Sequence, residues 1–102
     1  MNFNQLMKQA QQMQRKVNKV KKELDNEIYD FESQQGAVQG KINGKLEIVE
    51  LNINDQMLNN ENKEILQDLI MVSLNETIKK INKEREDTLN KVTNGVDVSA
   101  FL

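Results

Sequence analysis

The residues of this chain best suited to chemistry lie near its start, where positive charge gathers without any acid. Residues 1–22 contain no Asp or Glu and six cations, which are Lys8, Arg15, Lys16, Lys19, Lys21 and Lys22. The chain of 102 residues has a formal net charge of −2, and the other 8 of its 14 cations share residues 23–102 with all 16 acids. A basic end on an acidic body indicates an acidic partner, and nucleic acid is the first candidate.

A helical pattern separates these cations from the apolar residues around them. The apolar positions alternate spacings of three and four, which predicts a helix over residues 1–25 with a narrow heptad seam. The seam consists of Phe3, Leu6, Ala10, Met13, Val17, Val20 and Leu24. On the other faces stand Lys8, Arg15 and Lys22 at heptad position f, Lys16 at g and Lys19 at c. Such a row can follow a phosphate backbone, because each neutralised phosphate releases counterions. The alternative is a solvated helix face.

The heptad seam needs a partner, which is either the chain's own second helix or a second subunit. We favour packing on the second helix near its base, with a partner subunit completing the burial. Composition favours a dimer as well, because one Tyr, three Phe and no Trp make a thin core at this length.

The middle of the chain, residues 27–54, predicts a three-stranded antiparallel meander. Apolar residues alternate with polar ones in three short runs, which are Tyr29 and Phe31, then Val38, Gly40 and Ile42, then Val49, Leu51 and Ile53. Gln34-Gln35-Gly36 predicts the first turn. Asn43-Gly44 predicts a tight hairpin turn with positive φ at both residues. The outer strands of such a sheet leave free edges, and one edge could pair with a second copy.

A second long helix is expected over residues 60–93, with Asn59 or Asn60 as its cap. Its broad apolar face, suited to covering a sheet, consists of Ile65, Leu66, Leu69, Ile70, Leu74, Ile78 and Ile81. Residues 95–102 form a short tail without a structural assignment. The order predicts a single α+β domain over residues 1–102, an α-β-β-β-α protomer with a three-stranded antiparallel sheet and two long helices.

The second helix carries a weaker basic set. Its members are Lys79, Lys80, Lys83, Arg85 and Lys91, interleaved with Glu76, Glu84, Glu86 and Asp87. Pairing between residues four apart on a solvated helix is the preferred interpretation. Lys79 and Lys80 have the stronger case for a contact with DNA.

Catalysis finds little support in the composition. The chain has no His and no Cys, so the commonest general base and the thiolate ligands of metals are missing. No phosphate-binding loop or dinucleotide fingerprint is present. We therefore expect no enzyme, no metal, no cofactor and no small-molecule substrate. The N-terminal apolar residues are too scattered for a signal peptide, and no run is long enough to cross a membrane, so a cytoplasmic location is expected.

Three segments have a distinctive sequence. They are the Leu6–Gln14 opening, the Asn43-Gly44-Lys45 turn before a Val/Ile strand, and Asn62–Ile70 followed by Asn75 and Lys79-Lys80. Together they resemble the YbaB/EbfC family of bacterial nucleoid-associated proteins. The resemblance covers essentially the whole chain. The chain departs from the family in two places. The family usually has a Gly-rich segment before its second strand, where this chain has only Gly36 and Gly40, and the tail of this chain has no Pro. The resemblance implies an α-β-β-β-α protomer, a tweezer-like homodimer with projecting helices, and binding to duplex DNA in the nucleoid.

The expected DNA-binding residues are Lys8, Arg15, Lys16, Lys19, Lys22, Lys79 and Lys80. Arg15 is the only Arg in the basic helix, and guanine recognition favours Arg, so we expect low sequence specificity. The expected role is chromosome organisation, with regulation of nearby genes as an addition. The alternative is an adaptor that grips an acidic protein in a replication or repair complex.

Overall fold

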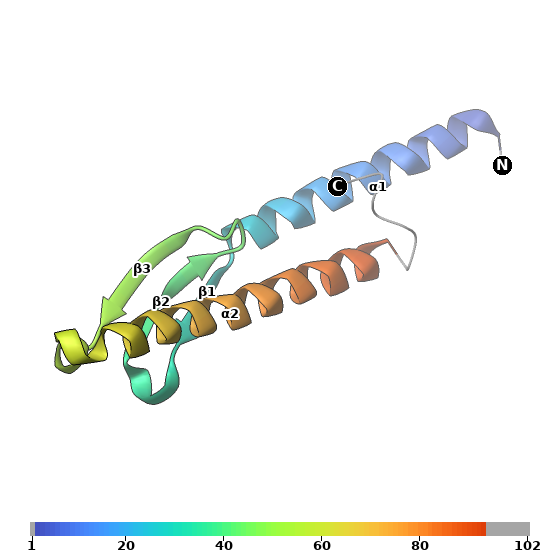
Figure 1. Cartoon of the computed structure of the whole chain (residues 1–102). Coiled ribbons are helices and arrows are strands. Elements are labelled where there is room, and N and C mark those ends of the chain that lie inside the picture. The colour runs from blue at the N-terminus through green and yellow to red at the C-terminus, as the bar shows by residue number, and fades with distance from the viewer. Residues whose placement is uncertain (1, 94–102) are drawn as a thin grey trace.

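The two long helices run side by side over part of their length, and a small sheet packs on the remaining part of the second helix (Figure 1). This computed structural model describes residues 2–93 and measures 70 × 18 × 16 Å. The elements are α1 (Phe3–Asn26), β1 (Ile28–Glu32), β2 (Val38–Asn43), β3 (Ile48–Ile53) and α2 (Lys63–Val92), with short 3-10 turns at Gln34–Gly36, Asp55–Met57 and Asn60–Asn62. The expected α+β fold class and the α-β-β-β-α order are confirmed. The tail, residues 95–102, lies outside the described residues.

α1 begins at a capping box that the sequence pattern did not single out. The Asn2 side chain accepts a hydrogen bond from the Gln5 backbone N–H at 2.8 Å, and the Gln5 side chain accepts one from the Asn2 N–H at 3.4 Å. Together they satisfy two of the donors that a helix N-terminus leaves free. The first turn carries no acid, so the N-terminal end of the helix stays positive.

The sheet is antiparallel in the order β1-β2-β3, as the alternating pattern predicted. Its register places Phe31 opposite Gly40, and Gly40 opposite Leu51. A Cβ on Gly40 would come 2.6 Å from Phe31 Cζ and would overlap the Glu50 carbonyl, so only glycine allows this close packing. The main core therefore forms on this face, from Phe31, Val38, Ile42 and Ile81.

α2 covers that core with most of the predicted face, which is Leu66, Leu69, Ile70, Leu74, Ile78 and Ile81. Ile65 was also expected there but is 54% exposed, because it lies on the flank of the helix beside the sheet edge. The start of the helix also differs from the expected residue 60. Residues 60–62 form a 3-10 turn, whose Asn62 N–H donates to the Asn59 side chain at 3.0 Å, and α2 starts at Lys63.

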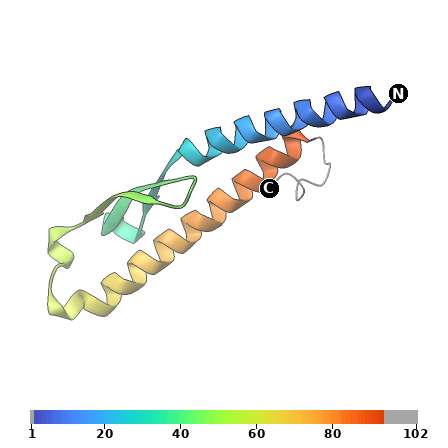
Figure 2. The same ribbon diagram turned by 90° about the horizontal axis from the view of Figure 1, so that it is seen from above.

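A second core joins the two helices, which run antiparallel (Figure 2). Val17 and Leu24 of α1 are buried against Leu89 of α2, with Met13, Val20 and Val92 packed around them. The expectation that the seam packs on the chain's own second helix is confirmed for this part. α2 ends at Val92, so within residues 2–93 no helix covers the remaining seam residues, and Phe3 is 72% exposed.

The β2–β3 turn has a different geometry from the one predicted. Positive φ occurs at Leu46 (66°), whereas Gly44 does not have it. The Asn43 N–H donates to the Glu47 carbonyl at 3.0 Å and the Leu46 N–H donates to the Asn43 carbonyl at 2.9 Å. These bonds enclose a three-residue loop, in which the third residue takes the left-handed conformation. The prediction of a tight turn with positive φ at Asn43 and Gly44 is therefore wrong.

Gly44 serves another purpose, because it lets the turn dock against the end of α1. Its N–H donates to the Glu27 carbonyl at 3.0 Å. A Cβ at this position would overlap the Leu24 carbonyl. The hairpin and the first helix are thus held together by a backbone contact that leaves no room for a side chain.

Replacing Gly44 with Ala should destabilise the fold, because the new methyl group must push the hairpin away from α1. We expect a loss of about 1–3 kcal/mol of unfolding free energy. For a domain of this size, each kcal/mol lowers the melting temperature by roughly 4–8 °C, which thermal denaturation followed by circular dichroism measures.

Leu46→Gly is the matched control in the same loop. Left-handed backbone costs a residue with a side chain about 1–2 kcal/mol, so glycine should maintain or raise the melting temperature. If Leu46→Gly destabilises the protein as much as Gly44→Ala does, the loop geometry described above is incorrect.

Candidate nucleic-acid interface

The predicted basic row lies on the solvent side of α1. Its members Lys8, Arg15, Lys16, Lys19 and Lys22 are all exposed, and none of them forms an ion pair within residues 2–93. Val17 and Leu24 of the same helix are buried against α2. The seam therefore turns the cations outward, as the heptad pattern predicted.

The spacing of the row suits a regular polyanion. An α-helix rises 1.5 Å per residue, so Lys8, Arg15 and Lys22 follow one another at about 10.5 Å and span about 21 Å. Duplex DNA has one phosphate per strand every 3.4 Å along its axis, so the row extends over about six base pairs. The packing of Val17 and Leu24 on α2 supports the second half of this row.

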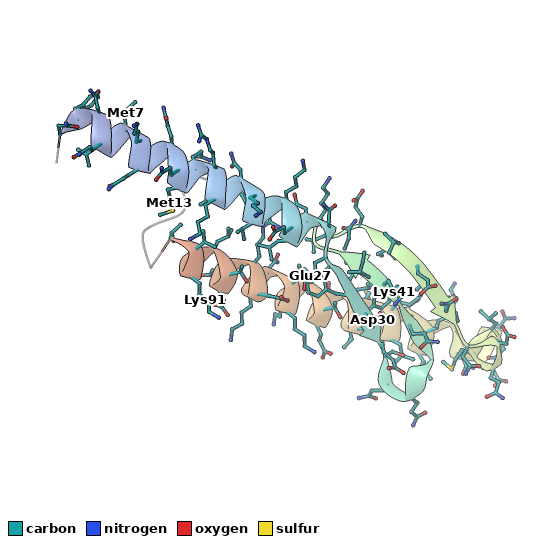
Figure 3. All side chains as sticks on the ribbon, turned by 180° about the vertical axis from the view of Figure 1, so that it is seen from behind. Met7, Met13, Glu27, Asp30, Lys41 and Lys91 are labelled. Carbon is teal, nitrogen blue, oxygen red and sulfur yellow. The ribbon has the colours of Figure 1, made fainter. Side chains whose placement is uncertain are left out.

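Lys79 and Lys80 are exposed on α2, but the structure does not bring them beside the row on α1. Their neighbours Ile78 and Ile81 pack on the sheet, so the two cations lie beyond the part of α2 that contacts α1. Lys91 lies on the part that does run beside α1 (Figure 3).

The expected pairing along α2 is not found. Lys79, Lys80, Lys83 and Lys91 form no ion pair within residues 2–93. Arg85 instead reaches Asp25 of α1, with 2.9 Å between Nη1 and Oδ1 and only about a quarter of each side chain exposed (26% and 29%). These residues are 60 apart in sequence, so no local pattern could have indicated this ion pair.

Tyr29, at the start of β1, lies between the end of α1 and α2 and stabilises their contact. Its hydroxyl donates to Glu27 Oε2 at 3.1 Å. Burial raises the pKa of this hydroxyl well above its ordinary value, and the hydrogen bond to Glu27 and the negative charges of Glu27 and Glu84 act in the same direction. Tyr29 is therefore a neutral hydrogen-bond donor at physiological pH, between the end of α1 and α2.

The outer face of the sheet is a poor surface for a polyanion. Lys41 lies opposite Asp30 and Glu50, and its ammonium is 2.7 Å from Asp30 Oδ1 (Figure 3). The hydrogen bond to Asp30 raises the pKa of Lys41, and the attraction of the carboxylates adds to it. The charge of Lys41 is thus already neutralised, which leaves the helices as the candidate surface for DNA.

Residues 2–93 offer no group of three acidic side chains arranged to hold a metal ion. Within the same residues, neither helix has the length and apolarity needed to cross a membrane.

Comparison with known proteins agrees with this geometry. The sequence model of the YbaB/EbfC DNA-binding family matches residues 1–96. The chain belongs to the YbaB/EbfC DNA-binding family. A nucleoid-associated protein of Clostridium novyi is 39% identical over 102 residues, which is 100% of this chain and 90% of that protein. A nucleoid-associated protein of Rickettsia akari is 35% identical over 97 residues, which is 95% of this chain and 91% of that protein.

The YbaB/EbfC fold is also found among solved structures. An uncharacterized protein of Helicobacter pylori superimposes with a TM-score of 0.79 at 28% sequence identity, covering 91% of this chain and 98% of that one. The family resemblance indicated by the sequence motifs is confirmed.

The Arg85–Asp25 ion pair should contribute measurably to the alignment of the helices. In a double-mutant cycle with Arg85→Gln and Asp25→Asn, we expect a coupling free energy of about 1 kcal/mol, because the pair is partly buried. Urea denaturation of the four proteins measures it. The exposed pair Lys41–Asp30 is the control, and its coupling should be smaller because solvent screens the two charges. Equal couplings for the two pairs would show that Arg85 does not join the helices.

Proposed function

We propose that this YbaB/EbfC protein binds duplex DNA with low sequence preference and contributes to the organisation of the chromosome. The observation that carries the proposal is the row of exposed cations on α1, in a stretch of 22 residues without an acid. Membership in a DNA-binding family supports it, and so do relatives named nucleoid-associated proteins.

The chemistry of the row favours contacts with the DNA backbone. Lys ammonium groups are point charges that suit phosphates, while Arg15 alone offers the planar fork that reads guanine. The row contains no aromatic side chain on which bases of a single strand could stack. Affinity should therefore come from phosphate neutralisation, with little dependence on DNA sequence. We place this non-enzymatic activity at the nucleoid in the cytoplasm, with regulation of nearby genes as a consequence.

The exposed apolar face beside β3 supports a homodimer as the binding form. Leu51 lies opposite Gly40 on the core side of the sheet, yet it is 46% exposed, because α2 packs mainly on β1 and β2. Ile48 (49%) and Met71 (55%) are similarly exposed, and the outer edge of β3 has no partner strand within residues 2–93. A second subunit at this edge would bury these residues and present two basic helices to one duplex.

Neutralising the row should weaken binding to unrelated duplexes nearly equally. For the combined variant Lys8→Gln, Arg15→Gln, Lys19→Gln and Lys22→Gln, the plot of log affinity against log salt should flatten by about 0.9 for each phosphate that the variant leaves unneutralised. Gel-shift titrations at several salt concentrations measure both effects.

The matched control combines Lys79→Gln and Lys80→Gln on α2, where we expect the smaller effect. Circular dichroism should be native for both variants, since all these positions are exposed. If the α1 variant keeps the affinity and salt dependence of the wild type, its basic row is only a solvated face.

The homodimer is tested by sedimentation at low micromolar concentration in moderate salt, where the mass should be about twice the 11.8 kDa chain. Leu51→Glu should shift the protein towards the monomer, because a carboxylate is costly to bury in an apolar interface. Ile28→Glu is the control, since Ile28 is equally exposed (52%) but lies on the outer face of the sheet. A wild-type monomer with native helicity would overturn the dimer.

A further inference from the structure

An acidic groove lies at the end of the molecule opposite the free end of α1. It has a volume of about 480 Å³ and runs between residues 32–34 and the first half of α2. Its lining contains three apolar and three acidic side chains besides the polar residues Ser33, Gln34 and Ser73. We call the apolar set, Ile65, Leu69 and Val72, the floor and the acidic set, Glu32, Asp68 and Glu76, the rim.

Within the described residues, the floor of this groove is not covered and its rim is not paired. Ile65 and Val72 are 54% and 55% exposed. The three rim carboxylates form no ion pair within residues 2–93. Apolar surface ringed by polar groups marks an interaction site. This groove, which combines apolar and acidic side chains, suits an apolar segment that also carries positive charge.

The chain itself carries such a segment at the free end of α1, which we call the α1 tip (residues 3–8). Phe3, Leu6 and Met7 are exposed by 72%, 51% and 46%, and Lys8 follows them. Residues 3, 6 and 7 lie three and four apart and so share one side of the helix. The tip projects beyond the end of α2, with Met7 close to its end (Figure 3).

Charge decides between the possible occupants of the groove. Two α1 tips would bring together helices that each carry six cations and no acid over residues 1–22, which is repulsive. The groove offers the opposite charge with a matching apolar floor. A chain cannot fill its own groove, because tip and groove lie at opposite ends of a rod 70 Å long (Figure 2).

We propose that the α1 tip of one copy docks in the acidic groove of another, so that copies associate head to tail. Phe3 and Leu6 lie on the floor formed by Ile65 and Val72, while Lys8, on the opposite side of the helix, adds its positive charge to the attraction between α1 and the carboxylate rim. A head-to-tail contact uses two different surfaces and leaves one of each free, so it can repeat along a line. This contact differs from the β3 edge of the proposed homodimer and does not require DNA.

Cross-linking tests the contact directly, because the chain has no cysteine of its own. We would mix the full-length variants Leu6→Cys and Val72→Cys without DNA at low salt, oxidise them, and quantify the disulfide-linked peptides by mass spectrometry. The peptide joining residue 6 to residue 72 should exceed by about tenfold the one obtained when Asn52→Cys replaces Val72→Cys, a preference of about 1.4 kcal/mol. Asn52 is exposed on the outer face of the sheet, away from the groove.

Sedimentation of the cysteine-free protein supplies the second measurement. The wild type should exceed the mass of a dimer as concentration rises at low salt. The combined variant Glu32→Gln, Asp68→Gln and Glu76→Gln should remain a dimer, and it should bind an isolated short duplex at least as tightly as the wild type. A wild-type mass that stops at the dimer, or equal cross-linking of residues 72 and 52 to residue 6, would overturn the proposal. Failure of the wild type to bind the duplex would overturn the proposed function instead.

Discussion

The antiparallel contact between the two helices is the constraint on which the rest of the structure depends. Val17 and Leu24 pack on Leu89, and the Arg85–Asp25 ion pair lies at the sheet end of the same contact. This packing fixes the rotation of α1 about its own axis. Because the seam faces α2, heptad position f must face solvent. An apolar contact that contains no charge therefore determines which way the basic row faces.

The junction between α1 and the sheet transmits this arrangement to the rest of the chain. The β2–β3 turn docks on the last turn of α1 through Gly44, while Tyr29 connects the start of β1 to carboxylates on both sides. These contacts are polar or backbone-mediated and short in range. A simple linker would leave the direction of the helix free, whereas these contacts fix it. A surface that follows a regular polyanion requires such a fixed direction.

Separation of charge along the rod gives its two ends different properties. The basic end combines cations with an uncovered apolar tip, and the other end combines carboxylates with an apolar groove. Such a molecule attracts DNA along its helices while its acidic body is repelled from the same phosphates. The polarity supports the proposed directional association of copies, by which a small protein with a thin core joins a larger assembly.

The sequence by itself determined the elements, their order, the sides of α1 and the family, because heptad spacing, strand alternation and local charge are properties of neighbouring residues. It also located the basic row on α1. Only the tertiary structure decided how far α2 covers the seam, that Arg85 pairs with Asp25, that Gly44 contacts Leu24, and that Ile65 lines a groove instead of the core. Each of these depends on residues far apart in the chain or on where one helix ends relative to another, and spacing within a single segment carries no information about such distances.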